Sequence, residues 1–192
     1  VSGTTISFGT PVVFNTGSSN TFSLTFDSTN NKIVIAYKDS NQHGQGVVGT
    51  VSGTNISFGS STAFQSNQTN NPNATYDIAS GKTLFSYVAA AESDYGAAKV
   101  ATVSGTSISF GSRVFFASAA TSRLVTAYDS NAGKHVISYA EPSSSNRGTS
   151  IVATVSGTSV SFGTPVVFDS SEITRTSTTF DSTNNKVVIA YR

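Results

Sequence analysis

The sequence contains no cysteine, no methionine and no tryptophan, and only 11% of its residues are charged. Without cysteine there is no disulfide framework, no thiolate metal site and no cysteine nucleophile. The absence of methionine even at position 1 predicts a processed product or a part of a longer chain. No apolar run of about 18 residues is present to span a membrane, and no signal-peptide pattern opens the chain.

Charge is scarce and nearly balanced, with a formal net charge of +1. Ordinary soluble domains have roughly 25% charged residues, so here Ser, Thr, Asn and Gly must supply solubility. No basic run is present, which excludes the electrostatic footprint that nucleic-acid binding requires. Uncharged polar surfaces are typical of secreted proteins, virion proteins and adhesins. We therefore expect no nucleic-acid partner, and an extracellular or virion-surface location.

A tandem repeat fills the chain. The motif Val-Ser-Gly-Thr starts at Val1, Val51, Val103 and Val155, at intervals of 50, 52 and 52 residues. A period of this size indicates one supersecondary unit copied in tandem, each copy burying its apolar face against its neighbours. We expect a single repeat domain over 1–192, with repeats at 1–50, 51–102, 103–154 and 155–192.

The local patterns within a repeat are those of strands. Polar and apolar residues alternate over 5–8, 11–14 and 22–26, and 32–37 is a nearly continuous apolar run. A further strand is expected at 46–51, and no segment has the spacing of an amphipathic helix. Aromatic residues recur at four fixed places per copy and are expected to form the core: Phe8, Phe58, Phe110 and Phe162; Phe14, Phe64, Phe116 and Phe168; Phe26, Tyr76, Tyr128 and Phe180; Tyr37, Tyr87, Tyr139 and Tyr191.

Two kinds of turn recur with the strands. The Gly of each Ser-Gly-Thr segment suits a hairpin that needs positive φ. A second hairpin begins with an aspartate in every copy, and we expect its carboxylate to accept backbone N–H groups in an Asx-turn: Asp27, Asp77, Asp129 and Asp181. A calcium loop is the alternative, although these turns lack the ligand density of an EF-hand.

A four-stranded antiparallel meander that repeats about every 50 residues is typical of a β-propeller blade. The chain therefore predicts an all-β, propeller-like array, either as four blades or as an arc of a larger or oligomeric ring. The last repeat stops after two expected strands, so ring closure would leave one strand unsupplied. A neighbouring chain or a partner would pair with that open edge by β-augmentation.

Sequence variation between copies differs between the two ends of the expected strands. The aspartate turns barely differ, whereas two sets of connections diverge: the hairpin loops 38–43, 88–95 and 140–147, and the crossovers 15–21, 65–74, 117–124 and 169–176. We call their common end the variable-loop face, since divergence over a shared scaffold is typical of a recognition surface. Its candidate ligand-binding residues are Asp39, His43, Glu92, Asp94, Tyr95, Arg123, Glu141, Arg147, Glu172 and Arg175.

These residue types suit a glycan better than a reaction. Tyr95 and His43 would stack on sugar rings, and Arg147 would clamp a carboxylate. A glycosidase needs two carboxylates about 5–9 Å apart. Asp39, Glu92 and Glu141 occupy similar loop positions and would converge on a ring axis, but nothing orders them as acid and base.

Other chemistry has no support in the sequence. There is no nucleophile elbow, phosphate loop or dinucleotide-binding fingerprint. His43 and His135 lack a cluster at metal-ligand spacing. We therefore expect no enzymatic activity, no cofactor and no metal site.

The run from Val155 to Phe168, and the segment from Asp181 to Tyr191, resemble the tandem repeats of marine bacteriophage and metagenomic virion proteins of tail-fibre type. The resemblance covers the whole chain. It implies a virion-surface or appendage protein with a propeller-like fold, and it carries no catalytic or ligand residues. The chain lacks the tryptophans of sugar-binding propeller lectins and the Ser-x-Asp-x-Gly-x-Thr-Trp box of sialidases, which argues against close kinship with either.

The function expected from the sequence is recognition without catalysis. An adhesion module would bind a glycan or host-surface receptor through the variable-loop face. The first alternative is a structural unit of a fibre or filament, with copies or neighbouring chains joined through edge strands. The second alternative is a propeller glycosidase.

Overall fold

The computed structural model describes residues 3–19 and 21–192. The protein is all-β, with 65% strand and no α-helix among the described residues, which confirms the predicted class. One turn of 3-10 helix, η1 (Pro142–Ser144), interrupts the strands. In this part of the chain no helix is long and apolar enough to cross a membrane. Val1 and Ser2 of the first repeat motif, and Asn20 of the first crossover, lie outside the described residues.

The strands recur with the period of the sequence, but each structural repeat begins at the strand before an aspartate turn and therefore ends within the next sequence repeat. From here on, repeat means this structural unit. The first contains β1 (Phe22–Asp27), β2 (Lys32–Lys38), β3 (His43–Ser52) and β4 (Asn55–Phe58). The remaining strands are β5 (Thr62–Asp77), β6 (Lys82–Ala89), β7 (Tyr95–Ser104), β8 (Ser107–Phe110), β9 (Val114–Ala120), β10 (Ser122–Asp129), β11 (Lys134–Glu141), β12 (Arg147–Ser156), β13 (Ser159–Phe162), β14 (Val166–Glu172), β15 (Thr176–Asp181) and β16 (Lys186–Tyr191).

Each of the first three repeats forms the same antiparallel sheet. In the first, β1 pairs with β2, β2 with β3, and β3 with both β4 and the first part of β5. The second repeat uses the rest of β5 with β6, β7, β8 and β9 in the same order. The third uses β10 to β14. The last repeat is the β15–β16 hairpin.

Strand β5 corrects one expectation from the sequence. The crossover 65–74, expected as a loop, lies inside a 16-residue strand. Residues up to Gln68 pair with β3 and residues from Thr69 onward pair with β6. A bulge between Asn70 and Asn73, where Asn71 has a φ of 48°, bends the strand within its pairing to β6. The crossover is extended because its backbone hydrogen-bonds first to the edge of one sheet and then, without an intervening loop, to the edge of the next. Likewise, Thr121 alone separates β9 from β10.

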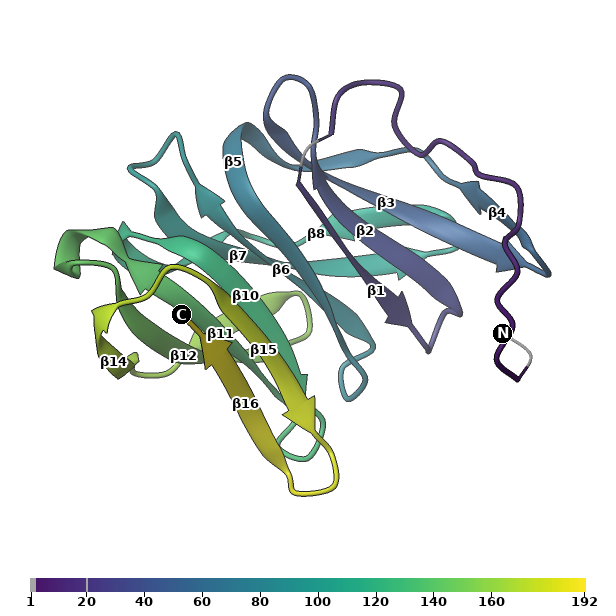
Figure 1. Ribbon diagram of the computed structural model, residues 1–192. Coiled ribbons are helices and arrows are strands. Elements are labelled where there is room, and N and C mark those ends of the chain that lie inside the picture. The colour runs from purple at the N-terminus through teal and green to yellow at the C-terminus, as the bar shows by residue number, and fades with distance from the viewer. Residues whose placement is uncertain (1–2, 20) are drawn as a thin grey trace.

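The successive sheets curl into a half-barrel. Figure 1 shows β1, β5, β10 and β15 running side by side along one side of the molecule. Hydrogen bonds link them across the repeats: the Ala74 N–H donates to Ser23 Oγ at 3.2 Å, and Thr75 Oγ1 donates to the Thr126 carbonyl at 3.4 Å. Thr176 Oγ1 donates in the same way to the carbonyl of Arg123. Neighbouring repeats are therefore joined along their first strands.

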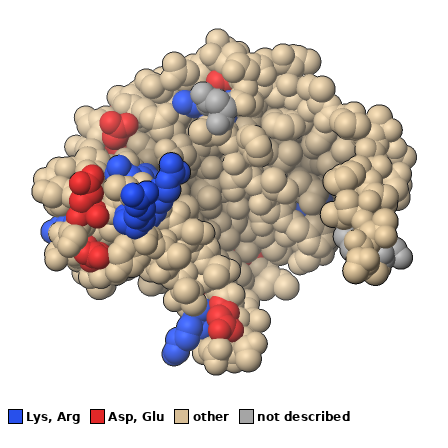
Figure 2. All heavy atoms as spheres, viewed as in Figure 1, with Lys and Arg blue, Asp and Glu red and all other residues tan. Residues whose placement is uncertain are grey.

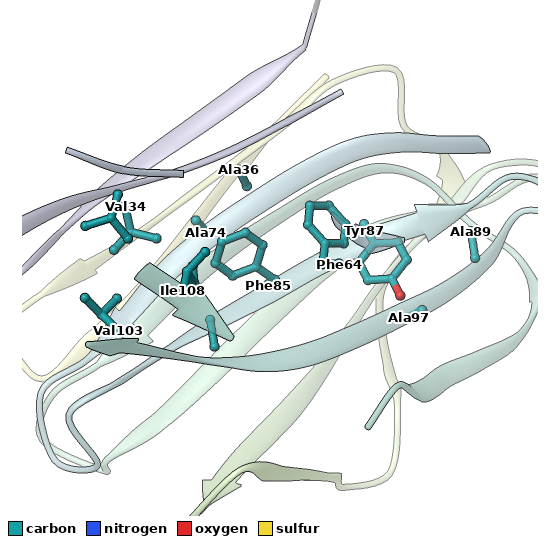
Figure 3. Close-up of a cluster of buried hydrophobic side chains, with 12 residues drawn as sticks. Val34, Ala36, Phe64, Ala74, Phe85, Tyr87, Ala89, Ala97, Val103 and Ile108 are labelled. Atoms are coloured by element: carbon teal, nitrogen blue, oxygen red, sulfur yellow. The ribbon is translucent and has the colours of Figure 1, made fainter. Parts of the chain in front are cut away.

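The core lies between the repeats. Figure 3 shows the first junction, where the Phe64 ring of β5 lies against Phe85 and Tyr87 of β6. Its ring centroid is 5.2 Å from that of Phe85 and 4.9 Å from that of Tyr87. The expected repetition of aromatic packing is confirmed by the equivalent pairs, Phe14–Tyr37 at 5.2 Å, Phe116–Tyr139 at 5.4 Å and Phe168–Tyr191 at 5.1 Å.

The core prediction is wrong at the two ends of the array. Tyr87 and Tyr139 are fully buried, but the equivalent Tyr191 is 48% exposed. Phe26 is 52% exposed and Phe8 is 87% exposed, although both were expected in the core. Each ring is buried by the adjoining repeat, so a terminal repeat has one uncovered face.

Glycine permits the close approach of successive repeats. An alanine Cβ at Gly59 would lie 2.0 Å from the carbonyl oxygen of Thr106, which belongs to the Ser-Gly-Thr turn of the next repeat. At Gly111 the same atom would lie 2.0 Å from the Thr158 oxygen, and at Gly9 it would lie 1.9 Å from the Thr54 oxygen. Real Cβ atoms are not found so close to a carbonyl oxygen. At these three glycines, successive repeats therefore pack backbone against backbone.

The aspartate turns form as predicted. The Asn30 N–H donates to Asp27 Oδ1 at 2.9 Å, and the Ser80 N–H donates to Asp77 Oδ1 at 3.0 Å. Asp77 is also buried against the third repeat, where Nε2 of His135 lies 3.7 Å from its Oδ2. Burial raises the pKa of Asp77, but His135, the Ser80 N–H and the Tyr128 hydroxyl lower it further, so the pKa lies well below its usual value.

We expect this pKa to make the second junction sensitive to acid. A lowered pKa in the folded state adds stability that is present above the unfolded-state pKa of about 4 and is lost as pH falls below it. Asp77→Asn should therefore cost about 2 kcal/mol at neutral pH, and the difference should shrink below about pH 4. Urea denaturation at a series of pH values measures it. The control is Asp129→Asn, whose counterpart to His135 in the next repeat is Val187; equal pH profiles would contradict the assignment.

Candidate functional site

Three equivalent hydrogen bonds hold the hairpin loops and the crossovers together at one end of the sheets. In each repeat a crossover N–H donates to the carbonyl of a hairpin-loop residue: Thr69 to Gln42 at 2.9 Å, Thr121 to Asp94 at 2.8 Å and Ile173 to Asn146 at 3.0 Å. The acceptors have left-handed φ values of 67°, 58° and 58°. The most divergent segments of the sequence are therefore joined in space, and they form the variable-loop face.

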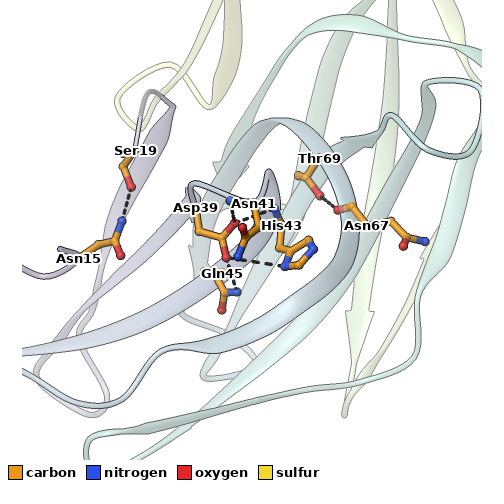
Figure 4. Close-up of polar contacts among 8 residues, drawn as sticks. All are labelled: Asn15, Ser19, Asp39, Asn41, His43, Gln45, Asn67 and Thr69. Carbon is orange, nitrogen blue, oxygen red and sulfur yellow. Dashed lines mark hydrogen bonds and ion pairs between the residues drawn. The ribbon is translucent and has the colours of Figure 1, made fainter. Parts of the chain in front are cut away.

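In the first repeat, Asp39 organises its own loop (Figure 4). Its Oδ1 accepts the N–H groups of Asn41 and His43, both at 2.9 Å, and its Oδ2 accepts Nε2 of Gln45 at 3.0 Å. The imidazole Nδ1 of His43 lies 3.8 Å from Oδ2. The carboxylate thus accepts three hydrogen bonds from its own hairpin, whereas the His43 ring is half-buried at the surface.

In the second repeat, Glu92 belongs to a cluster that spans two repeats. Arg113 Nη1 donates to Glu92 Oε1 at 2.8 Å and to Gln65 Oε1 at 3.3 Å. Burial raises the pKa of Glu92, but the hydrogen bond and charge of Arg113 lower it by more, so the net shift is downward. The Arg113 guanidinium also lies 4.6 Å from the centroid of the Phe115 ring.

Tyr95 lies beside this cluster. Its ring meets the Phe115 ring edge-on, with centroids 5.8 Å apart. Phe115 is 39% exposed, and Tyr95 is half-buried. The neighbouring Asp94 contributes its carbonyl, which accepts from the Thr121 side chain at 3.2 Å as well as from the Thr121 N–H. Asp94 therefore has a loop-fixing role through its backbone.

In the third repeat, Glu141 and Arg147 neutralise each other. Arg147 donates to Glu141 Oε2 from Nη2 at 2.7 Å and from Nε at 2.9 Å. The Arg147 guanidinium is thus occupied, unlike the carboxylate clamp expected from the sequence. Below this pair, burial and the charge of Glu141 raise the pKa of Tyr139 to about 12. A hollow of about 190 Å³ opens there, lined by Phe116, Tyr139, Glu141, Pro165 and three small residues at 117–119.

Arg123 and Glu172 are brought together through Asn146. Arg123 has a φ of 53°, and its Nε donates to the Thr174 carbonyl at 2.7 Å. Its Nη1 donates to Asn146 Oδ1 at 3.1 Å, and Asn146 Nδ2 donates to Glu172 Oε1 at 3.1 Å. A polar chain that the sequence pattern did not predict thus links β10, the hairpin loop and β14 of the third repeat.

Two adjoining hollows lie where the first strands begin. One, of about 260 Å³, is lined by Asn71, Arg123, Leu124, Val125, Thr174, Arg175 and Thr176. The other, of about 320 Å³, shares Asn71 and Leu124 and is also lined by Thr21, Phe22, Ser23, Pro72 and Asn73. They contact all four repeats, and most of their lining comes from the variable crossovers.

The charge on this side is concentrated at one place. Figure 2 shows a blue group of Lys and Arg atoms over the region where β10 and β15 begin in Figure 1, with red acidic atoms beside it. Arg123 and Arg175 line the hollow there, and a third hollow of about 350 Å³ is lined by Arg175 together with Arg192. The rest of this view is largely uncharged.

The carboxylates expected at a ring axis are not paired with one another. Asp39, Glu92 and Glu141 are each held within a different set of partners, and no hydrogen bond or ion pair among the described residues joins any two of them. Within 3–19 and 21–192, no group of three or more His, Asp or Glu residues is placed to hold a metal ion. Each of the three carboxylates is thus held by partners of its own.

Sequence reasoning missed Arg113, Gln65 and Asn146. A signal for Arg113 exists, because the equivalent place in the other copies is Pro11, Ser61 or Pro165. A charged residue that breaks the repeat at one position indicates a local partner, here Glu92.

No protein-family model, curated protein or solved structure matches the chain.

Proposed function

We propose that this protein is a non-catalytic recognition module, exposed outside the cell or on a virion surface, that binds acidic glycans through its variable-loop face. The scaffold is a propeller-like array of four repeats. Two features support that arrangement: the first strands of all repeats run side by side, and each sheet packs on the next through the same aromatic pair.

One observation carries the proposal: the adjoining hollows of about 260 and 320 Å³ at the ends of the first strands. Their walls offer the amides of Asn71 and Asn73, which donate and accept hydrogen bonds as sugar hydroxyls require. The exposed guanidinium of Arg175 borders the same space, and it suits a carboxylate or sulfate group. Recognition sites are commonly concave with a few placed polar groups.

A glycan array followed by titration calorimetry tests the proposal. The wild-type chain should bind glycans that carry carboxylate or sulfate groups. Arg175→Ala should weaken that binding about tenfold or more, because a charge-assisted hydrogen bond contributes about 1.5–3 kcal/mol.

The matched control is Lys186→Ala. It removes one positive charge at the far end of the β15–β16 hairpin, beside the aspartate turn, whereas Arg175 lies directly before β15. Binding should be unchanged in this variant. Absence of any glycan binding by the wild type would overturn the proposal, and equal weakening in both variants would indicate non-specific charge attraction.

A further inference from the structure

The two ends of the array expose the two halves of one interface. In β1, Leu24 is 59% exposed and Phe26 is 52% exposed. The equivalent residues of β5 are Ala74 and Tyr76, which are 5% and 9% exposed because the first repeat covers them. Tyr76 even reaches back into that repeat, where its hydroxyl bonds Thr29 Oγ1 at 2.6 Å. The β1 face is therefore the surface against which a preceding repeat packs.

The other end of the array presents the complementary surface. Val34 in β2 and Leu84 in β6 are fully buried, and each lies at its junction with the following repeat. Their equivalent in β16 is Val188, which is 50% exposed. The outer face of β15–β16 thus repeats the apolar position that the following repeat covers at the inner junctions.

A third position identifies the same open junction independently. Gly9, Gly59 and Gly111 each lie against the threonine carbonyl of the next Ser-Gly-Thr turn. At the equivalent Gly163 a Cβ would find nothing nearer than the Val152 oxygen at 3.8 Å. Among the described residues, the glycine at this place lies against a turn in three copies of the sequence repeat, and against none at Gly163.

From these observations we propose that two copies of this chain associate head to tail, with the β1 face of one copy docked on the β15–β16 end of the other. In this arrangement Thr4 of the docking copy lies against Gly163, as Thr158 lies against Gly111 within the chain. The occupant is a second copy because the interface continues the one that the chain forms between its own repeats. This contact joins faces of sheets, unlike the edge-strand pairing expected from the sequence.

The proposed number of copies comes from the shape of the sheets. The sheets of one chain curl into a half-barrel, and in the proposed assembly a second half-barrel closes the curve. Such a contact is heterologous, since different surfaces meet, and it ends when the rotation closes. The inference is independent of glycan binding, because Leu24, Val188 and Gly163 do not line the hollows at the variable-loop face.

Light scattering after size exclusion on the 192-residue chain tests the proposal. The wild type should have twice the 19.8 kDa mass of one chain. Leu24→Asp should give a monomer by placing a charge in the apolar contact. Gly163→Ala should also give a monomer, because the new methyl group occupies the place of the Thr4 carbonyl. Ile78→Asp is the matched control: Ile78 is also 59% exposed but lies in an inner turn, and the dimer should persist.

Mixing the two monomeric variants distinguishes head-to-tail docking from any symmetric contact. The Leu24→Asp chain keeps an intact β15–β16 end, and the Gly163→Ala chain keeps an intact β1 face. Together they should form a dimer through one interface, although neither variant associates alone. A monomeric wild type, or an oligomer that both substitutions leave intact, would overturn the proposal. A longer polymer that both substitutions abolish would overturn the two-copy closure.

Discussion

Replacing Phe64 with alanine is expected to lower the free energy of unfolding by about 3–5 kcal/mol. The ring is 1% exposed, and it contacts Phe85, Tyr87 and Phe110 with centroids 4.9–5.8 Å apart. Its removal leaves a cavity at the junction of the first two repeats, where the neighbouring rings are held by their own strands. Urea denaturation followed by far-UV circular dichroism measures the loss.

Phe8→Ala is the control for this prediction. Phe8 has the same side chain and was expected in the core from the sequence, but it is 87% exposed. In the Leu24→Asp background, where copies do not associate, its replacement should change stability by less than about 0.5 kcal/mol. A loss below 1 kcal/mol at Phe64 would mean that the first junction is not packed through this ring, and the account of the core would fail with it.

Much of the fold could be predicted because the same hydrophobic pattern occurs in several copies, which can be compared with one another. A single alternating stretch is ambiguous, but Lys32–Tyr37 and its three copies agree on a buried strand that ends in tyrosine. The aspartate turns were predictable for a local reason: an Asx-turn needs only its own carboxylate and the next backbone N–H groups. Asp27 and Asp77 both accept the N–H of the residue three positions further along.

Burial at the ends could not be read from the same pattern. Tyr87 and Tyr191 are the same residue at the same place in the repeat, yet one is fully buried and the other is 48% exposed. Periodicity reports which face of a strand is apolar, whereas burial depends on the presence of the adjoining repeat. The prediction of a loop at 65–74 was wrong for a related reason. Variability between copies suggested a loop there, but backbone pairing with two sheets keeps the segment extended as part of β5.

The sequence predicted which segments form the variable-loop face, but it did not predict which side chains contact one another there. The divergent segments do meet, through backbone bonds such as the one from Thr121 to Asp94. Some partners of the candidate charges lie within the divergent segments, as Arg147 and Glu141 do, but others come from outside them or from their backbone. Arg113, which holds Glu92, precedes β9, and the Thr174 carbonyl holds Arg123. Which side chains pair between repeats depends on how one repeat is shifted and rotated in space against the next. The spacing of equivalent residues along the sequence does not give that shift.

Gly59→Ala is expected to cost about 3 kcal/mol, because an inserted methyl group meets backbone and not a side chain that can turn away. Its Cβ would lie 2.0 Å from the Thr106 carbonyl oxygen and 3.0 Å from the carbonyl carbon. Relief requires the second repeat to move away from the first, which loosens the packing of Phe64 as well. The measurement is urea denaturation in the Leu24→Asp background, so that association of copies does not contribute.

Gly163→Ala in the same background provides the comparison, because it makes the identical change at the equivalent place with no turn opposite. Here the reduced freedom of the unfolded chain should leave stability unchanged or raise it by about 0.4–1 kcal/mol. Equal losses at both positions would show that backbone conformation, and not the approach of the next repeat, makes glycine necessary. A loss at Gly59 alone would assign the glycine to the repeat-to-repeat step, and the failure of Gly163→Ala chains to dimerise would then follow from docking and not from misfolding.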